Sequence, residues 1–384
     1  MPGTVPRRRH GAGPILWALT GLLVAAGLVV AWVGLGGRKP SETVLKPGLV
    51  EIDTRQAPRA AGPIQLREVT EETGIRFVHT DGSSGRRYIV ETITAGLALF
   101  DYDGDGWIDI YFLNGAPLAG TQRVGSPPRN ALYRNEGGWR FVDVTKQAGV
   151  GDTGFGLGVA TADYDNDGDQ DIFVNNYGPN VLYRNNGDGT FSNVTQKAGV
   201  SSGEEVGAGA CFLDIDADGD LDLYVANYVK FTYETHVLHS RDGFPLYAGP
   251  GEYPSEPDFL YRNDGDGSFT DVSSQSGVGQ HAGAGMGLVC GDYDDDGDTD
   301  IFVLNDVAAN FLFENDGKGK FEEVGLMVGA AFNGSGDELG SMAIDCGDYD
   351  NDGRLDFIMT SYQNELPVLY RNIPGGILED VTTA

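Results

Sequence analysis

Cysteine, histidine and basic residues are scarce in this 384-residue sequence, and each scarcity excludes a class of protein. Three cysteines cannot build the disulfide framework of a small secreted domain. Lys and Arg number 26 against 57 Asp and Glu, for a net charge of −31, so no basic stripe exists to meet nucleic-acid phosphates. The sequence also lacks a nucleophile elbow, an H-E-x-x-H motif, a P-loop and a dinucleotide fingerprint. None of these common catalytic motifs therefore points to an enzyme.

Charge is absent altogether from one long apolar stretch, residues 14–37, which is long enough to span a hydrocarbon core as a helix. The arginines of the basic segment 1–13 outnumber the cations that follow the stretch, which favours a cytoplasmic N-terminus. We expect a transmembrane signal anchor at 14–37 and a flexible linker at 38–63. A cleaved signal peptide is the alternative. The first places the rest of the chain on the periplasmic or extracellular side of a membrane, and the second secretes it.

Glycine, by contrast, is abundant at 58 residues, which indicates many tight turns and short strands. Five of these glycines occupy the sixth position of a repeated nine-residue pattern, D-x-D-x-D-G-x-x-D. The five copies, called loops one to five, begin at Asp101, Asp163, Asp214, Asp292 and Asp348. Carboxylates at positions 1, 3, 5 and 9, with a Gly at 6 for the sharp turn, suit a hard cation such as Ca²⁺.

The twelfth position of each copy decides which kind of calcium loop the pattern indicates. An EF-hand needs a bidentate Glu there and a helix on each side. The five residues at this position are all apolar: Phe112, Val174, Val225, Val303 and Met359. The EF-hand is excluded, and the short apolar runs after the loops predict buried strands instead.

The predicted calcium ligands are the carboxylates of each loop and the backbone carbonyl of position 7. These residues are Asp101, Asp103, Asp105, Trp107 and Asp109 in loop one; Asp163, Asp165, Asp167, Asp169 and Asp171 in loop two; Asp214, Asp216, Asp218, Asp220 and Asp222 in loop three; Asp292, Asp294, Asp296, Asp298 and Asp300 in loop four; and Asp348, Asp350, Asp352, Arg354 and Asp356 in loop five. Because position 7 offers only its carbonyl, Trp107 and Arg354 do not exclude a site. Up to five structural Ca²⁺ ions are expected, with folding coupled to their binding.

The loops recur inside a longer repeat. Each unit has a Gly-rich apolar strand, the loop, a second strand, a third strand ending in Tyr-Arg-Asn or a close variant, a Gly-rich turn, and a fourth strand ending in most copies in Val-Thr or Val-Ser. Four short strands per repeat predict an all-β fold, a β-propeller of four-stranded blades, over residues 64–384. The three cysteines, Cys211, Cys290 and Cys346, lie two or three residues before a loop. We expect them to be buried, small apolar residues, too far apart to pair.

The insertion and the ends of the array depart from the repeat. Residues 228–258 are inserted in the third unit and carry His236 and His239, for which a transition-metal site is a minor alternative to a polar loop surface. Residues 66–70 form a fourth-strand motif with no strands before it, yet the C-terminal unit has its own fourth strand at 378–382. We therefore expect five visible blades of an incomplete ring, of seven blades in the complete form.

The repeat resembles FG-GAP/VCBS repeats, and more narrowly the cartilage-acidic-protein and ASPIC/UnbV type. The resemblance rests on Asp-Tyr-Asp-Asn-Asp-Gly-Asp-x-Asp-Ile-Phe-Val at 163–174, Leu-Tyr-Arg-Asn-Asn-Gly-Asp-Gly-Thr-Phe at 182–191, and the Val-Thr-x-x-Ala-Gly-Val that follows. It implies an integrin-α-like propeller with Ca²⁺ between the first and second strands of each blade, and an extracellular interaction role.

Two features depart from this family. Ala248-Gly249-Pro250 stands where the family often has Cys-Gly-Pro, so no disulfide is expected in the insertion. The family's C-terminal ASPIC/UnbV module is missing, which favours a fragment of a longer protein.

The sequence thus predicts an exported, membrane-tethered, calcium-binding propeller that acts as an interaction or adhesion module on an extracellular protein or glycan. A carbohydrate-active enzyme resembling a polysaccharide lyase is the alternative, and a purely structural surface repeat is a third. The enzyme would need cationic and aromatic side chains to converge at one mouth of the ring. The insertion offers Lys230, Tyr233, His236, His239 and Arg241 for this.

Overall fold

The computed structural model describes residues 67–93, 96–122 and 125–382. The chain divides into two units, Met1–Arg67 and Glu68–Ala384, and the second carries the fold. The predicted basic segment, signal anchor and linker lie outside the described residues. Within the described ranges, no helix has the length and apolar character needed to cross a membrane.

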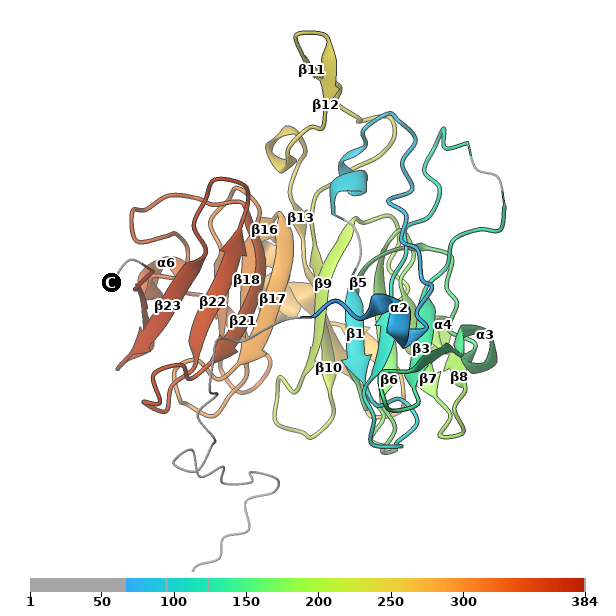
Figure 1. The fold of residues 1–384 in the computed structure, drawn as a ribbon. Coiled ribbons are helices and arrows are strands. Elements are labelled where there is room, and N and C mark those ends of the chain that lie inside the picture. Colours follow the sequence, from blue (N-terminus) through green and yellow to red (C-terminus); the bar gives the residue numbers. More distant parts are fainter. Residues whose placement is uncertain (1–66, 94–95, 123–124, 383–384) are drawn as a thin grey trace, which may run out of the picture. The chain divides into compact units, whose positions relative to one another are not determined.

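The described chain is an all-β fold built mainly of five four-stranded antiparallel sheets (Figure 1). We call these sheets blades one to five, since their arrangement is propeller-like. Their strands are β1 (Leu97–Phe100), β2 (Asp109–Phe112), β3 (Ala131–Asn135) and β4 (Phe141–Asp143); β5 (Phe155–Ala162), β6 (Asp171–Tyr177), β7 (Val181–Asn185) and β8 (Phe191–Asn193); β9 (Gly207–Leu213), β10 (Asp222–Asn227), β14 (Phe259–Asn263) and β15 (Phe269–Asp271); β17 (Gly285–Gly291), β18 (Asp300–Asn305), β19 (Phe311–Asn315) and β20 (Phe321–Glu323); and β21 (Ser341–Gly347), β22 (Asp356–Ser361), β23 (Val368–Ile373) and β24 (Ile377–Asp380).

Short elements connect the blades. The α-helices are single turns: α2 (Thr70–Thr73), α3 (Thr145–Ala148), α4 (Thr195–Ala198), α5 (Ser273–Ser276) and α6 (Gly325–Val328). The 3₁₀ turns are η1 (Ile89–Thr92), η2 (Pro250–Glu252) and η3 (Val278–Gln280). Two further two-stranded sheets pair β11 (His239–Arg241) with β12 (Phe244–Leu246), and β13 (Glu256–Pro257) with β16 (Ala282–Gly283).

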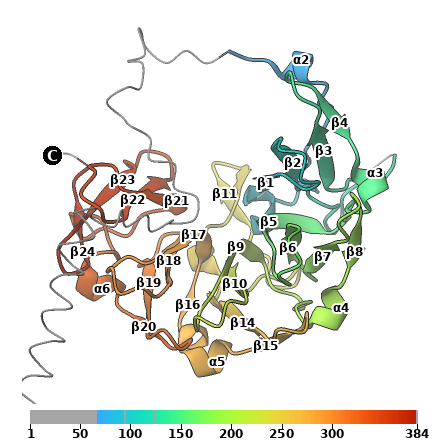
Figure 2. The same ribbon diagram turned by 90° about the horizontal axis from the view of Figure 1, so that it is seen from below.

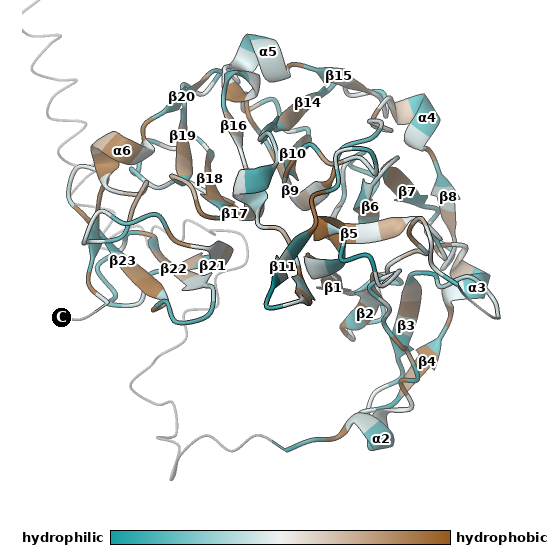
Figure 3. Ribbon diagram, turned by 90° about the horizontal axis from the view of Figure 1, so that it is seen from above, coloured by the Kyte–Doolittle hydropathy of each residue, from teal (hydrophilic) through white to brown (hydrophobic). Residues whose placement is uncertain are grey.

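Successive blades pack through their first strands, since β1 contacts β5, β5 contacts β9, β9 contacts β17, and β17 contacts β21. Figure 2 shows these strands toward the middle of an arc and the fourth strands toward its rim. Blades one and five stand apart in Figures 2 and 3. In Figure 3 the apolar colour falls on strands such as β19 and β23.

The core lies between the blades, because alternate side chains of each strand face opposite neighbours. In the second strand of each blade, the third residue faces the next blade. It is buried as Phe173 in blade two and as Phe302 in blade four, where the exposed fractions are 0% and 1%. The second and fourth residues face the preceding blade, as Ile172 and Val174 do in the cluster they share with Tyr111. In blade five the third residue is Ile358, which remains 50% exposed.

The sequence predicts that Val-Thr and Val-Ser pairs end the fourth strands, but in the structure these pairs follow the strands. β4 ends at Asp143, and Thr145 begins the helical turn α3. The Thr145 hydroxyl oxygen accepts the Leu132 N–H at 2.9 Å, so the hydroxyl ties this turn to the third strand. The turn closes at Gly149, whose φ of 81° favours glycine. This side-chain bond replaces one backbone ladder bond, while the Val144 N–H still donates to the Leu132 carbonyl at 2.9 Å.

The prediction of a fourth strand at 66–70 is wrong for its described residues. Residues 67–69 form no strand, and Thr70 begins α2. Gly74, which closes α2, lies against the Phe141 carbonyl of blade one. Gly149, which closes α3, lies in the same way against the Phe191 carbonyl of blade two. The helical turn α2 therefore packs on blade one in the way that the turn of a preceding blade would.

The prediction that no cysteines pair is also wrong. Cys211 and Cys290 form a disulfide between β9 and β17, with Cα atoms 7.2 Å apart. Cys211 lies three residues before its loop and Cys290 two, so their side chains leave opposite faces of their sheets and meet between the blades. Cys346 occupies the same register as Cys290 but is free. The residue that matches Cys211 in blade four is Val289, which packs in the same cluster as Cys346.

Candidate metal centres in the five aspartate loops

Each aspartate loop connects the first and second strands of its blade and lies at one end of the fold. The insertion follows the opposite end of β10, and its hairpin β11–β12 projects from the other side of the arc (Figure 1). The five loops therefore share one face, and the insertion belongs to the other.

Three carboxylates converge in every loop, with one oxygen from each within 4.8 Å of the others. Positions 1 and 3 take part in all five loops, joined by position 5 or position 9. The groups are Asp101, Asp103 and Asp109; Asp163, Asp165 and Asp167; Asp214, Asp216 and Asp218; Asp292, Asp294 and Asp300; and Asp348, Asp350 and Asp356. Among the described residues, no such group includes His236 or His239, so the structure does not bring together a transition-metal site there.

The turn of each loop is held by the carboxylate of position 1. In loop two, Asp163 accepts the Asp167 N–H at 3.0 Å and the Gly168 N–H at 2.9 Å. Gly168 has a φ of 96°, which explains the invariant glycine at position 6 of the five copies. Asp167 in turn accepts the Asp169 N–H at 3.0 Å. These bonds fold the loop so that its carboxylates face inward.

The aspartate at position 9 is buried beneath the loop. Asp171 accepts the Tyr164 N–H at 3.1 Å and the Asn185 N–H at 2.7 Å, so it joins the loop to the third strand. Burial raises the pKa of Asp171 to about 7, although both hydrogen bonds oppose the rise. Burial likewise raises the pKa of Asp222 and of Asp300 to about 7.

The aspartate at position 3 supplies the test of whether a cation fits. One carboxylate oxygen, Oδ1, is buried without a hydrogen-bond partner in each of Asp165, Asp216 and Asp294. Burial and the neighbouring carboxylates raise the pKa of Asp165. Buried charged oxygens without donors are costly, and a bound cation removes that cost. With only oxygen donors present, the residues fit a hard cation.

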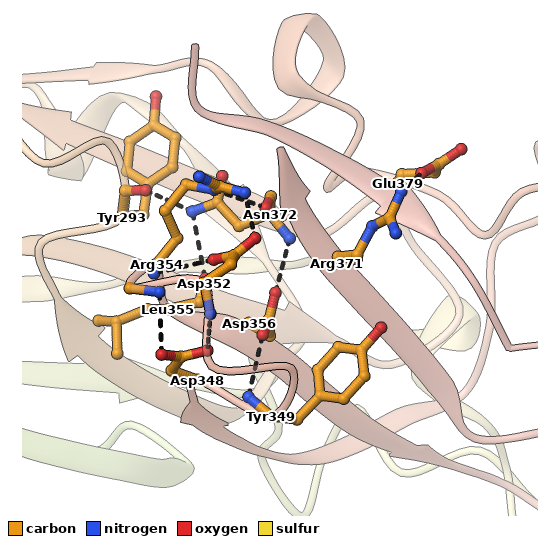
Figure 4. A network of polar contacts seen from close by, with 11 residues as sticks. Tyr293, Asp348, Tyr349, Asp352, Arg354, Leu355, Asp356, Arg371, Asn372 and Glu379 are labelled. Carbon is orange, nitrogen blue, oxygen red and sulfur yellow. Dashed lines mark hydrogen bonds and ion pairs between the residues drawn. The ribbon is translucent and has the colours of Figure 1, made fainter. Parts of the chain in front are cut away.

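Loop five departs from this arrangement at position 7 (Figure 4). Its residue there is Arg354, whose Nε donates to the Asn372 carbonyl at 2.8 Å. The guanidinium also forms an ion pair with the carboxylate of Asp352, a predicted ligand. The sequence could not show that this side chain folds back over its own loop.

The Asn that ends the third-strand motif, for which the sequence predicts a general hydrogen-bonding role, links adjacent loops in blades two to five. The Asn263 side chain donates to the carbonyl of Leu221 in its own loop at 3.0 Å, and to the Tyr164 carbonyl of the preceding blade's loop at 2.8 Å. Asn372 makes the same contact with Tyr293 (Figure 4). The recurrence of the motif was the available signal, but the partner lies in another repeat.

Among the candidate residues of the insertion, only Tyr233 and His236 share a neighbour in the contacts of the described residues. Tyr233 and His236 both pack their rings on Tyr88. Lys230 lies 3.9 Å from a carboxylate oxygen of Glu256, and His239 lies 3.4 Å from one of Glu252. Arg241 lies on the hairpin strand β11.

The chain belongs to the FG-GAP-like repeat family. The family matches residues 101–174, 163–225, 241–303 and 292–359, which together cover more than half of the chain. The resemblance read from the loop and Tyr-Arg-Asn motifs is thereby confirmed.

Curated relatives narrow the type of repeat. The chain is 26% identical over 241 residues to cartilage acidic protein 1 of Xenopus tropicalis, covering 60% of this chain and 34% of that protein. It is 28% identical over 265 residues to human cartilage acidic protein 1, covering 54% of this chain and 39% of that protein. The chain thus spans between a third and two fifths of the length of these relatives.

Solved structures resemble the fold more loosely. An Agrocybe aegerita lectin that recognises non-reducing terminal N-acetylglucosamine gives a TM-score of 0.39 at 18% identity, covering 75% of this chain and 65% of the lectin. The rhamnogalacturonan lyase YesW gives 0.38 at 15% identity, covering 74% and 50% of the two chains. At these scores, neither likeness transfers a function.

Proposed function

We propose that the protein is a calcium-binding, propeller-like interaction module that works outside the cytoplasm. The observation that carries the calcium assignment is the convergence of three carboxylates in the same register of all five blades. The carboxylates of positions 1, 3, 5 and 9 and the carbonyl of position 7 would hold the ion. Bound Ca²⁺ would neutralise the repulsion among these carboxylates and cross-link the first and second strands.

Calcium binding is tested by calorimetric titration of the full chain after chelation and buffer exchange. We expect up to five Ca²⁺ per chain, with Mg²⁺ binding more weakly because it demands near-octahedral geometry. Asp163→Asn removes a position-1 charge from loop two and should lower the stoichiometry by one. Its control is Asp188→Asn, which changes an exposed aspartate in the β7–β8 turn. No calcium heat in the native protein would overturn the assignment.

An extracytoplasmic location is supported by the disulfide between Cys211 and Cys290, because such bonds persist in oxidising compartments. The predicted signal anchor at 14–37 would tether the module to a membrane. Carbonate extraction of membranes tests this part: the full chain should stay in the pellet, and a chain beginning after residue 63 should not. Recovery of both in the supernatant would contradict the tether and favour a secreted form.

The interaction surface that we propose is the hairpin β11–β12. Leu238, which directly precedes β11, is 70% exposed, and Phe244 and Leu246 of β12 are 74% and 45% exposed. Exposed apolar side chains grouped on one projection are typical of binding surfaces. Screening the full chain against secreted proteins and glycans, with and without Ca²⁺, identifies the ligand. The variant Phe244→Ser/Leu246→Ser should lose the ligand and keep its melting temperature. Unchanged binding by this variant would refute the hairpin as the surface.

A further inference from the structure

Blade four replaces the arginine of the Tyr-Arg-Asn motif with a glutamate. The motif reads Phe313-Glu314-Asn315 there and Tyr-Arg-Asn in the other four blades. Asn315 keeps its place, because its N–H donates to Asp300 of loop four at 2.9 Å. The backbone register is therefore unchanged, and the substitution alters only the charge beside the loop.

The Glu314 side chain is bound directly to loop four. Tyr293 stands between the ligands Asp292 and Asp294 in the sequence, and its hydroxyl donates to Glu314 Oε2 at 2.7 Å. Glu314 thus adds its negative charge to a loop that already holds a buried, unpartnered oxygen on Asp294.

In the first three blades the same position holds an arginine, which carries the opposite charge. In blade two, Arg184 lines one pocket together with Tyr164 and the ligand Asp165. A cation beside the ligands weakens the attraction of the loop for a second cation.

In loop five the positively charged side chain, Arg354, belongs to the loop itself. The Arg354 guanidinium forms an ion pair with Asp352, which takes a carboxylate away from a metal (Figure 4). Asp348 and Asp350 of this loop are exposed, so solvent screens their charge. Loop five therefore has the fewest free charges, whereas loop four has six aspartates: Asp292, Asp294, Asp295, Asp296, Asp298 and Asp300.

We propose that the five calcium sites are graded, with loop four binding most tightly because of Glu314 and loop five most weakly because of Arg354. This inference rests on the proposed calcium binding. It makes loop four the site that stays filled when calcium is low, and loop five the site that fills last.

Calorimetric titration of the full chain at low ionic strength tests the grading. The native protein should show one tight step of stoichiometry one before the weaker steps. Glu314→Arg should weaken that step by about tenfold or more without changing the total stoichiometry. Glu314→Gln, which keeps a partner for the Tyr293 hydroxyl, should fall between the two.

Two further variants should strengthen calcium binding, because each removes a positive charge beside a loop. Arg262→Glu in blade three should create a second tight step, and Arg354→Leu should strengthen the last step by about tenfold. Circular dichroism at saturating calcium checks that each variant is folded. Five equal steps that none of these substitutions alters would overturn the grading and leave calcium binding intact. Absence of calcium heat in the native chain would overturn the proposed function itself.

Discussion

The side-chain amide of Asn263 reaches out of its own blade and donates a hydrogen bond to the Tyr164 carbonyl, 2.8 Å away in the loop of blade two. Asn263 is 4% exposed, so the carbonyl would lose its partner in a buried place if the amide were removed. Each loop from two to five is tied in this way to the loop before it. The aspartate loops and the packing of the blades are therefore one connected structure.

Asn263→Ala should lower the free energy of unfolding by about 2–4 kcal/mol, because it leaves buried carbonyls without donors. The control is Asn135→Ala in blade one. Its amide donates to the Ile108 carbonyl of its own loop at an exposed site, and it should cost about 1 kcal/mol or less. Urea unfolding at saturating calcium measures both. Equal costs would show that the link between blades contributes nothing.

Removal of calcium should destabilise the whole array, because the carboxylates of each loop would then repel one another. A site filled at a thousand times its dissociation constant contributes about 4 kcal/mol. We expect excess chelator to lower the melting temperature by ten degrees or more, and added Ca²⁺ to restore it. Mg²⁺ at the same concentration serves as the control and should restore less. An unchanged melting temperature in excess chelator would contradict the structural role of the ions.

The carboxyl group of Asp258 should make stability depend on pH. Asp258 is buried in blade three, where it accepts the Tyr224 hydroxyl at 2.6 Å and the Asn227 N–H at 2.7 Å. Burial raises the pKa of Asp258 to about 7, above its unfolded value near 4. The folded protein then binds the extra proton, so the contribution is complete below about pH 4 and is lost as the pH rises through about 7.

The variant Asp258→Asn imitates the protonated carboxyl and should remove this dependence. Unfolding of both proteins is measured from pH 4 to pH 8, and their difference cancels the titration of the loops. We expect that difference to grow by about 3 kcal/mol in favour of the variant. A constant difference across the range would show that Asp258 is ionised throughout.

Ile301 and Ile358 differ in whether a neighbouring blade covers the face on which they lie. Ile301 is 0% exposed between blades three and four, whereas Ile358 on the outer face of blade five is 50% exposed. Ile301→Ala should cost about 2–5 kcal/mol, and Ile358→Ala about 1 kcal/mol or less. Thermal or urea unfolding checks this. A large cost at Ile358 would mean that something covers this face in solution.

Sequence reasoning reached the repeat, the strand order and the convergence of the loop aspartates, because these depend on spacing within one unit. Asp163 and Gly168 predict their own turn, and the apolar residue at the twelfth position predicts the strand that follows. The sequence did not predict the contacts between one repeat unit and the next. The pairing of Cys211 with Cys290 depends on a one-residue difference in register that decides which blade each side chain faces.

The side chains of Asn263 and Arg354 show the same limit at the candidate site. The motif containing Asn263 signalled a repeated hydrogen bond, but its acceptor is 99 residues away in sequence. For Arg354 the sequence predicts only a carbonyl ligand, whereas the side chain forms an ion pair with the carboxylate of Asp352, a predicted ligand. Local patterns indicate which residues lie in a loop, whereas partners contributed by another blade need the three-dimensional packing.

The disulfide between Cys211 and Cys290 also determines what a protease can release. The two cysteines are 79 positions apart in the sequence, and the stretch between them includes the whole insertion and its exposed hairpin β11–β12. Surface hairpins are the usual sites of proteolytic nicking. A chain cut between β11 and β12 becomes two polypeptides that remain covalently joined, so it migrates as one species until a reductant is added. The hairpin can therefore be opened without separating blade four from blade three.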